Sequence, residues 1–140
     1  MRDYISEKVK HTPRHFNFGG ISVYETEPTP DNINISTILR AIEDNFPSHY
    51  FKDLESVKIG HMEEFDERDV SAVYRDHKFY ITNRQDNPQD LMNDIVHEFA
   101  HHIETIYPEA VYKDESVKRE FLRKRQELYY EVRSEGYWTE

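Results

Sequence analysis

The sequence predicts an α+β protein in which a small mixed β-sheet packs on helices. Short β-rich segments come before residue 83, and two long helical patterns follow them. No internal repeat or linker interrupts this order, and 140 residues are enough for one hydrophobic core. We therefore expect residues 1–140 to form a single domain with the element order β-α-β-β-β-α-α.

The strands are predicted from β-branched and aromatic segments that are bounded by turn residues. They are expected at residues 21–24, 54–59, 70–74 and 78–82, and residues 75–77 join the last two as a hairpin. Residues 1–20 show no clear periodic signal, although Gly19 and Gly20 indicate a turn. The acid-rich residues 61–69 are expected to form a loop.

Apolar residues at helical spacing predict a helix at about residues 35–46, which Asn34 or Asp31 could cap and Pro47 follows. A last, heavily charged helix is expected at about residues 116–133, after a loop at residues 108–115.

The helix between them has a stronger start signal. Asn87 supplies a cap, Pro88 suits the first turn, and Asp90 lies at the third helical position. Pro108 bars continuation, so this helix should run from about Pro88 to Ile106.

Composition excludes several classes of protein. With 28 acidic and 18 basic residues the net charge is −10, which opposes nucleic-acid binding and favours a basic substrate segment. The chain has no cysteine, so disulfides, thiolate metal sites and a cysteine nucleophile are excluded, and a metal site would need His, Asp or Glu.

No apolar run approaches the roughly 20 residues that cross a membrane. The first eight residues contain no signal-peptide core, so a cytoplasmic protein is expected and a mature secreted form remains open.

Residues 97–101 read His-Glu-Phe-Ala-His, an H-E-x-x-H motif within the predicted helix. A spacing of four places His97 and His101 on one helix face, where two imidazoles can converge on one zinc ion. Glu98 is rotated away from His97 and can accept a proton from a metal-bound water. The composition alone would produce this pattern about 0.05 times by chance. The motif therefore predicts Zn²⁺ as cofactor, with His97 and His101 as ligands and Glu98 as catalytic base.

A helical wheel of residues 88–106 separates two faces. The apolar residues gather on one side, and His97 and His101 lie roughly opposite, beside Asp90, Asp94 and Glu104. This arrangement suits a helix between a sheet and a cleft, and it also suits a plain solvated face.

The other histidines do not share the ligand spacing. His102 lies near the apolar side and is interpreted as a packed core or rim histidine. The remaining ones are expected at the surface; they are His11, His15, His49, His61 and His77.

Residues 70–107 resemble the core of the zincin metallopeptidases, in which an edge strand precedes the H-E-x-x-H helix. The resemblance extends over about residues 20–107 and implies that the active-site helix lies under an edge strand. It places His97 and His101 on the zinc ligands and Glu98 on the general base. It also implies that residues 79–82 form the edge strand that binds a peptide or protein substrate as an added antiparallel strand. The local pattern is similar to lethal-factor-type peptidases and phage-associated zincin domains.

The third zinc ligand separates the branches of this family. The metzincin branch would need Gly at Glu104 and His at Tyr107, so the resemblance is to the gluzincin branch, which uses a Glu from a following helix. The candidates there are Glu120, Glu127, Glu131 and Glu135. Glu120 has a plausible spacing but, like Glu127, points away from the apolar stripe, and Glu135 lies at a frayed end. A third zinc ligand outside this chain therefore remains open. Glu104 could orient one of the zinc-binding side chains without itself contacting the zinc.

Three functions follow from these observations. The first is a zinc-dependent metallopeptidase that acts on a peptide or protein, with no nucleic-acid or membrane partner. The second is a zincin-like binding module without catalysis, and the third is a non-enzymatic acidic protein in which the motif is accidental.

Overall fold

The computed structural model of the chain describes residues 12–109 and 115–134, and in the second range it describes the side chains of residues 118–128. The strands are β1 (Arg14–Phe18), β2 (Ile21–Glu25), β3 (Ser56–Ile59), β4 (Ala72–Arg75) and β5 (Lys78–Ile81). The longer helices are α2 (Ile35–Asn45), α4 (Pro88–Ile106) and α6 (Glu115–Ser134). Two short helical segments, η1 (Ser48–Phe51) and α3 (Glu63–Arg68), complete the described elements.

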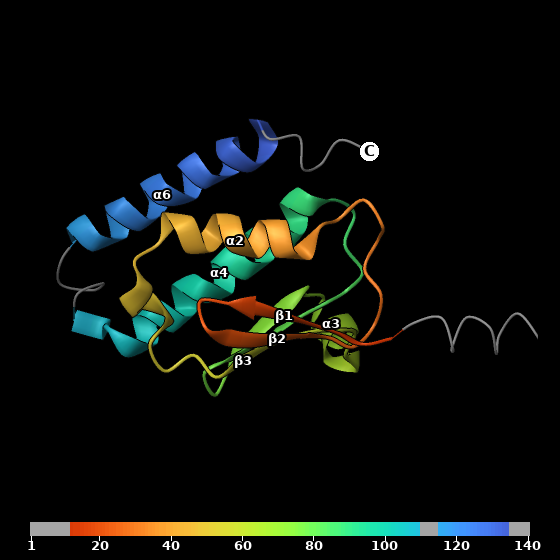
Figure 1. Cartoon of the computed structure of the whole chain (residues 1–140). Helices are drawn as coiled ribbons and strands as arrows, with labels where there is room; N and C mark the ends of the chain where they lie inside the picture. The colour runs from red at the N-terminus through yellow and green to blue at the C-terminus, as the bar shows by residue number, and fades with distance from the viewer. Residues whose placement is uncertain (1–11, 110–114, 135–140) are drawn as a thin grey trace, which may run out of the picture.

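The five strands form one mixed sheet in the order β1-β2-β3-β5-β4. The two outer pairs are antiparallel, and β3 runs parallel to both β2 and β5. Figure 1 shows α2, α4 and α6 on the same side of the sheet. The predicted α+β class, with a mixed sheet packed against helices, is therefore confirmed. No helix in the described ranges is both long and apolar enough to cross a membrane.

The predicted edge strand is wrong. Residues 78–81 form β5, which lies inside the sheet between β3 and β4, and β4 is the edge. The burial of the two strands explains this order, because Phe79 and Ile81 of β5 are fully buried while Arg75 of β4 is exposed. The hairpin itself is confirmed: its turn residues Asp76 and His77 both have positive φ, which suits a tight two-residue connection.

Three elements were not expected from the sequence. Strand β1 buries only Phe18 completely, as an edge strand does, so its apolar alternation is weak. Its connection to β2 is the predicted Gly19–Gly20 turn, with φ values of 60° and 85°. The expected acidic loop contains α3, whose first-turn acids suit a helix N-terminus and whose Phe65 is buried. The third is η1, which adds Tyr50 and Phe51 to the core.

The three predicted helices are present, and two have the expected caps. Asn34 accepts a hydrogen bond from the Thr37 amide at 3.1 Å, and Asn87 accepts one from the Asp90 amide at 2.8 Å. Helix α4 has the predicted bounds of 88 and 106. It packs on β4 and β5 and contacts both α2 and α6. The predicted loop before α6 includes residues 110–114, which lie outside the described residues.

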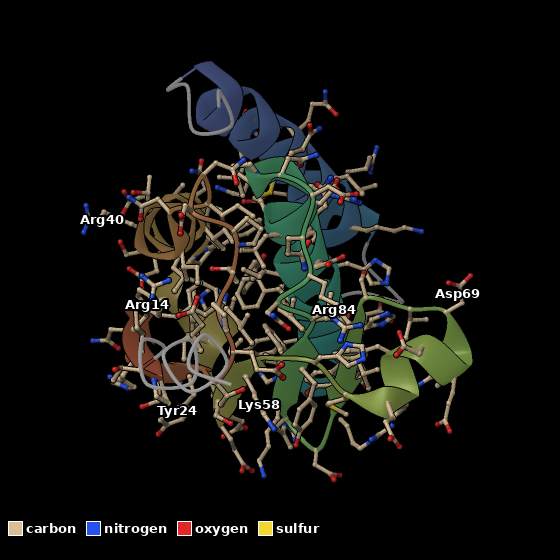
Figure 2. All side chains as sticks on the ribbon, turned by 90° about the vertical axis from the view of Figure 1, so that its right-hand side faces the viewer. Arg14, Tyr24, Arg40, Lys58, Asp69 and Arg84 are labelled. Carbon is tan, nitrogen blue, oxygen red and sulfur yellow. The ribbon has the colours of Figure 1, made fainter. Side chains whose placement is uncertain are left out.

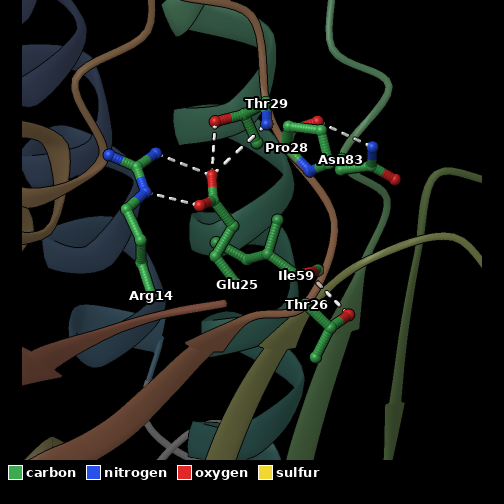
Figure 3. A network of polar contacts seen from close by, with 7 residues as sticks. All are labelled: Arg14, Glu25, Thr26, Pro28, Thr29, Ile59 and Asn83. Atoms are coloured by element: carbon green, nitrogen blue, oxygen red, sulfur yellow. Dashed lines mark hydrogen bonds and ion pairs between the residues drawn. The ribbon is translucent and has the colours of Figure 1, made fainter. Parts of the chain in front are cut away.

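A polar network joins the first two strands to the loops behind them (Figure 3). Glu25 is fully buried at the end of β2, and Arg14 of β1 donates two hydrogen bonds to its carboxylate at 2.5 and 2.8 Å. The Thr29 hydroxyl donates a third at 2.7 Å, and nearby Asn83 donates to the Pro28 carbonyl at 2.8 Å. These bonds supply the partners that a buried carboxylate requires.

Candidate metal centre

Helix α4 presents the motif residues to a cavity because its opposite face is the core. The buried residues of that face are Leu91, Met92, Ile95, Val96, Phe99 and Ile103. His97 and His101 are both exposed on the other side, as the helical wheel predicts. The packing of α4 therefore fixes the direction in which the two imidazoles point.

The two imidazoles converge. The Nε2 atoms of His97 and His101 lie 3.2 Å apart, and the ring planes are inclined by 86°. Two zinc–nitrogen bonds of about 2.05 Å at a tetrahedral angle place their nitrogens about 3.3 Å apart. Partial burial, followed by the positive charges of His101 and Arg125, lowers the pKa of His97 below its ordinary value. Its ring is therefore neutral at pH 7, as a metal ligand must be.

Glu98 lies beside the histidines but points inward. It is only 5% exposed, and burial, more than any other cause, raises the pKa of its carboxyl. The charge of Asp94 acts in the same direction, and that of His101 opposes it. A partly desolvated carboxyl at the edge of a polar cavity has the character of a proton acceptor in catalysis.

A cavity of about 490 Å³ joins these residues to the edge of the sheet. His97, Glu98, His101 and Glu104 line it from α4, and β4 forms the facing wall. The cavity therefore lies between the motif and the outer edge of β4, which pairs with no second strand among the described residues, and an extended peptide could add to the sheet there.

Asp94 is a further residue of this site. Its carboxylate accepts a hydrogen bond from the Ser71 hydroxyl at 2.8 Å and one from the Gln85 amide at 3.0 Å. Burial, above all, raises the pKa of Asp94. The sequence placed Asp94 beside His97 on the wheel but gave no sign of these two partners, which come from other loops.

His102 is the buried core histidine that the sequence predicts. It is fully buried, and its Nε2 donates to the Lys52 carbonyl at 2.7 Å. Nδ1 is therefore an acceptor in the neutral ring, and the Tyr74 hydroxyl donates to it at 2.8 Å. This pair ties the edge strand to α4 behind the cavity.

The other described histidines do not line the cavity with His97 and His101. His15 and His49 are exposed as expected, whereas His61 and His77 are half-buried. His61 Nε2 lies 2.8 Å from an Asp66 carboxylate oxygen, and the His77 ring lies edge-to-face with Tyr74. His11 lies outside the described residues.

The described residues contain no third metal ligand. No group of three His, Asp or Glu within residues 12–109 and the described part of α6 could hold a metal ion. Glu120 and Glu127 are exposed and lie near Lys124 and Arg123 respectively, which agrees with their predicted outward direction. The side chain of Glu131 and the whole of Glu135 lie outside the described part. The donor geometry therefore fits zinc at two positions, those of His97 and His101.

Comparison of the chain with known protein families, curated proteins and solved structures finds no match.

Proposed function

We propose that this protein is a zinc-dependent metallopeptidase of the zincin type. The observation that carries the proposal is the 3.2 Å separation of the His97 and His101 Nε2 atoms, with Glu98 lining the same cavity. If the H-E-x-x-H sequence were accidental, nothing would require the two imidazoles to converge or the glutamate to be buried. Nor would anything require the edge of the sheet to face these residues.

The roles of the residues follow from their positions. His97 and His101 would hold the zinc ion through Nε2. Zinc, when bound, supplies a Lewis acid and lowers the pKa of a coordinated water to near 7. Glu98 accepts the proton of the attacking water and returns it to the leaving amine of the cleaved peptide bond. The free edge of β4 holds the peptide as an extended strand, in place of the segment 79–82 that the resemblance implied.

The assignment to a branch of the zincins depends on which residue supplies the third zinc ligand. We place the protein nearer the gluzincin branch, with similarity to lethal-factor-type and phage-associated zincin domains. Glu120 is disfavoured because its side chain is exposed and its carboxylate lies 3.9 Å from the Lys124 ammonium of the same helix. Glu135 or a residue outside this chain is left as the source.

A second function has one observation in its favour. Because no third ligand is found among the described residues, a zincin-like binding module that has lost catalysis would have the same geometry. Such a module would bind peptides at β4 without hydrolysing them.

The experiment compares zinc-loaded parent with the Glu98→Gln variant on a random-sequence peptide library, with cleavage followed by mass spectrometry. Gln keeps the size of the side chain and removes the proton acceptor. The parent should cleave peptides, and the variant should retain zinc while hydrolysis falls about 100-fold or more. Cleavage at equal rates would remove Glu98 from its role. A zinc-bound parent without activity would favour the binding module.

A further inference from the structure

The wall of the cavity opposite the histidines carries two guanidinium groups. Arg75, the last residue of β4, and Arg68, the last residue of α3, both line the cavity that contains His97 and Glu98. Figure 2 shows α3 at the side of the molecule where Asp69 is labelled, and Arg14, Tyr24 and Arg40 lie on the opposite side. Two positive charges therefore face the motif across a cavity whose α4 side carries the carboxyl groups of Glu98 and Glu104.

One carboxylate holds both guanidiniums in place. Glu64 of α3 accepts hydrogen bonds from Arg75 at 2.6 and 3.0 Å and from Arg68 at 2.8 Å. These bonds lower the pKa of Glu64 to about 2, so it is ionised at neutral pH. The cluster of Glu64, Arg68 and Arg75, taken by itself, carries a charge of +1, and Glu98 and Glu104 lie on the opposite wall of the same cavity.

Both guanidiniums keep donors for another ligand. Each has five N–H groups, of which Arg75 uses two and Arg68 uses one in the described contacts with Glu64. Their side chains are 47% and 55% exposed, so water and a ligand can reach them. No other described carboxylate forms an ion pair with either residue. Paired arginines with a fixed orientation bind carboxylates in a bidentate manner.

We propose that Arg68 and Arg75 make this cleft selective for peptides that carry a carboxylate, either an Asp or Glu side chain or a free C-terminus. This inference rests on the proposed function, because it takes the cavity as the peptide-binding cleft. It differs from the expectation of a basic substrate segment, which the net charge of −10 favours. Charges more than a screening length of about 8 Å from the ligand act weakly at physiological salt, so the preference depends on the free N–H groups that Arg68 and Arg75 offer in the cavity more than on the net charge of the chain.

The test uses the full chain with Glu98→Gln, zinc-loaded and immobilised, so that bound peptides are not cleaved. A random heptapeptide library is applied in two forms, one with free C-termini and one with amidated C-termini, and retained peptides are sequenced. We expect Asp and Glu to be enriched in the amidated library if side chains are recognised. Enrichment of free over amidated peptides would instead identify the C-terminal carboxylate.

Three variants on the same background separate carboxylate binding from a structural role. Replacing Arg68 and Arg75 together by Gln should reduce the enrichment about fivefold, near the upper range of an exposed ion pair. Glu64→Gln breaks the same ion pairs but leaves both guanidiniums, so the enrichment should persist or rise. Arg40→Gln removes an exposed positive charge on the opposite side of the molecule and should change nothing. Circular dichroism checks that each variant is folded.

The inference is overturned if the parent background retains no peptide, or retains peptides without a preference for carboxylates. It is also overturned if Glu64→Gln loses the enrichment as fully as the double arginine variant, because the cluster would then be structural only. The selection does not depend on hydrolysis. A parent that cleaves without this preference would contradict the inference alone, and a parent that shows the preference without cleavage would contradict the peptidase proposal alone.

Discussion

Ser71 donates a hydrogen bond of 2.8 Å to Asp94, and this bond joins the residue before β4 to the helix that carries His97. The same carboxylate accepts from the Gln85 side chain, and the Ser71 carbonyl accepts from the Thr82 amide at 2.9 Å. Asp94 therefore holds the start of the edge strand at a fixed distance from α4. This hydrogen bond and the one between Tyr74 and His102 both connect β4 to α4 across the width of the cleft.

Removal of the Asp94 carboxylate should loosen the edge strand. In Asp94→Ala two hydrogen bonds are lost, each worth roughly 1 kcal/mol, so amide exchange at residues 70–73 should accelerate up to about 30-fold. Hydrogen exchange followed by mass spectrometry measures this rate. Asp94→Asn can still bond both partners and should change it less. Unchanged exchange in the Ala variant would show that the strand is held by other contacts.

A second prediction concerns the glutamates of the last helix. Because Glu120 and Glu127 are exposed and lie near basic side chains of α6, neither Glu120→Ala nor Glu127→Ala should weaken zinc binding as much as His101→Ala does. Competition with a fluorescent zinc chelator gives the affinities. One variant that matched the loss of His101→Ala would identify the third ligand and establish a gluzincin site within this chain.

A third prediction concerns stability and pH. In Arg14→Leu the fully buried Glu25 loses its charged partner, and the free energy of unfolding at pH 7 should fall by about 1–3 kcal/mol. Burial acts to raise the pKa of Glu25, but the bonds from Arg14 and Thr29 dominate, and the pKa is lower than its ordinary value. The stability that Glu25 contributes is therefore present above its unfolded pKa and is lost as the pH falls through its folded pKa.

Urea unfolding at pH 7 and in acid tests this assignment. The difference between parent and Arg14→Leu should shrink as the pH falls from the unfolded pKa of Glu25 toward its lowered folded pKa, because Glu25 becomes protonated over that range. Thr29→Val, which removes one neutral donor, should cost less than Arg14→Leu. A gap that stayed constant down to pH 2 would mean that packing, not charge, stabilises this corner.

The sequence predicts the parts of the fold that depend on strong local signals. The Asn87 cap and the Pro108 stop define α4, and the 3.6-residue period separates His97 from the buried Ile95 and Phe99. These signals are local, so no tertiary information is needed to place the motif on the correct face.

The parts that the sequence does not predict depend on long-range contacts. Strand β4 lies at the edge because β3 pairs with β5 and not with β4. The order of the strands along the chain does not indicate this pairing. Helix α3 owes its stability in part to burial of Phe65 beneath it, which a count of acidic residues does not reveal. The partners of Asp94 and the grouping of Arg68 with Arg75 likewise join separate segments.

The most direct test of the account is the zinc content of the purified protein after dialysis, measured by inductively coupled plasma mass spectrometry. The parent should carry close to one zinc per chain. His97→Ala and His101→Ala should each carry almost none, because a single imidazole cannot hold the ion. His15→Ala, which removes an exposed histidine of β1, should keep the parent value. Equal zinc in the parent and in His97→Ala, or a metal-free parent that takes up no added zinc, would contradict the assignment of this site.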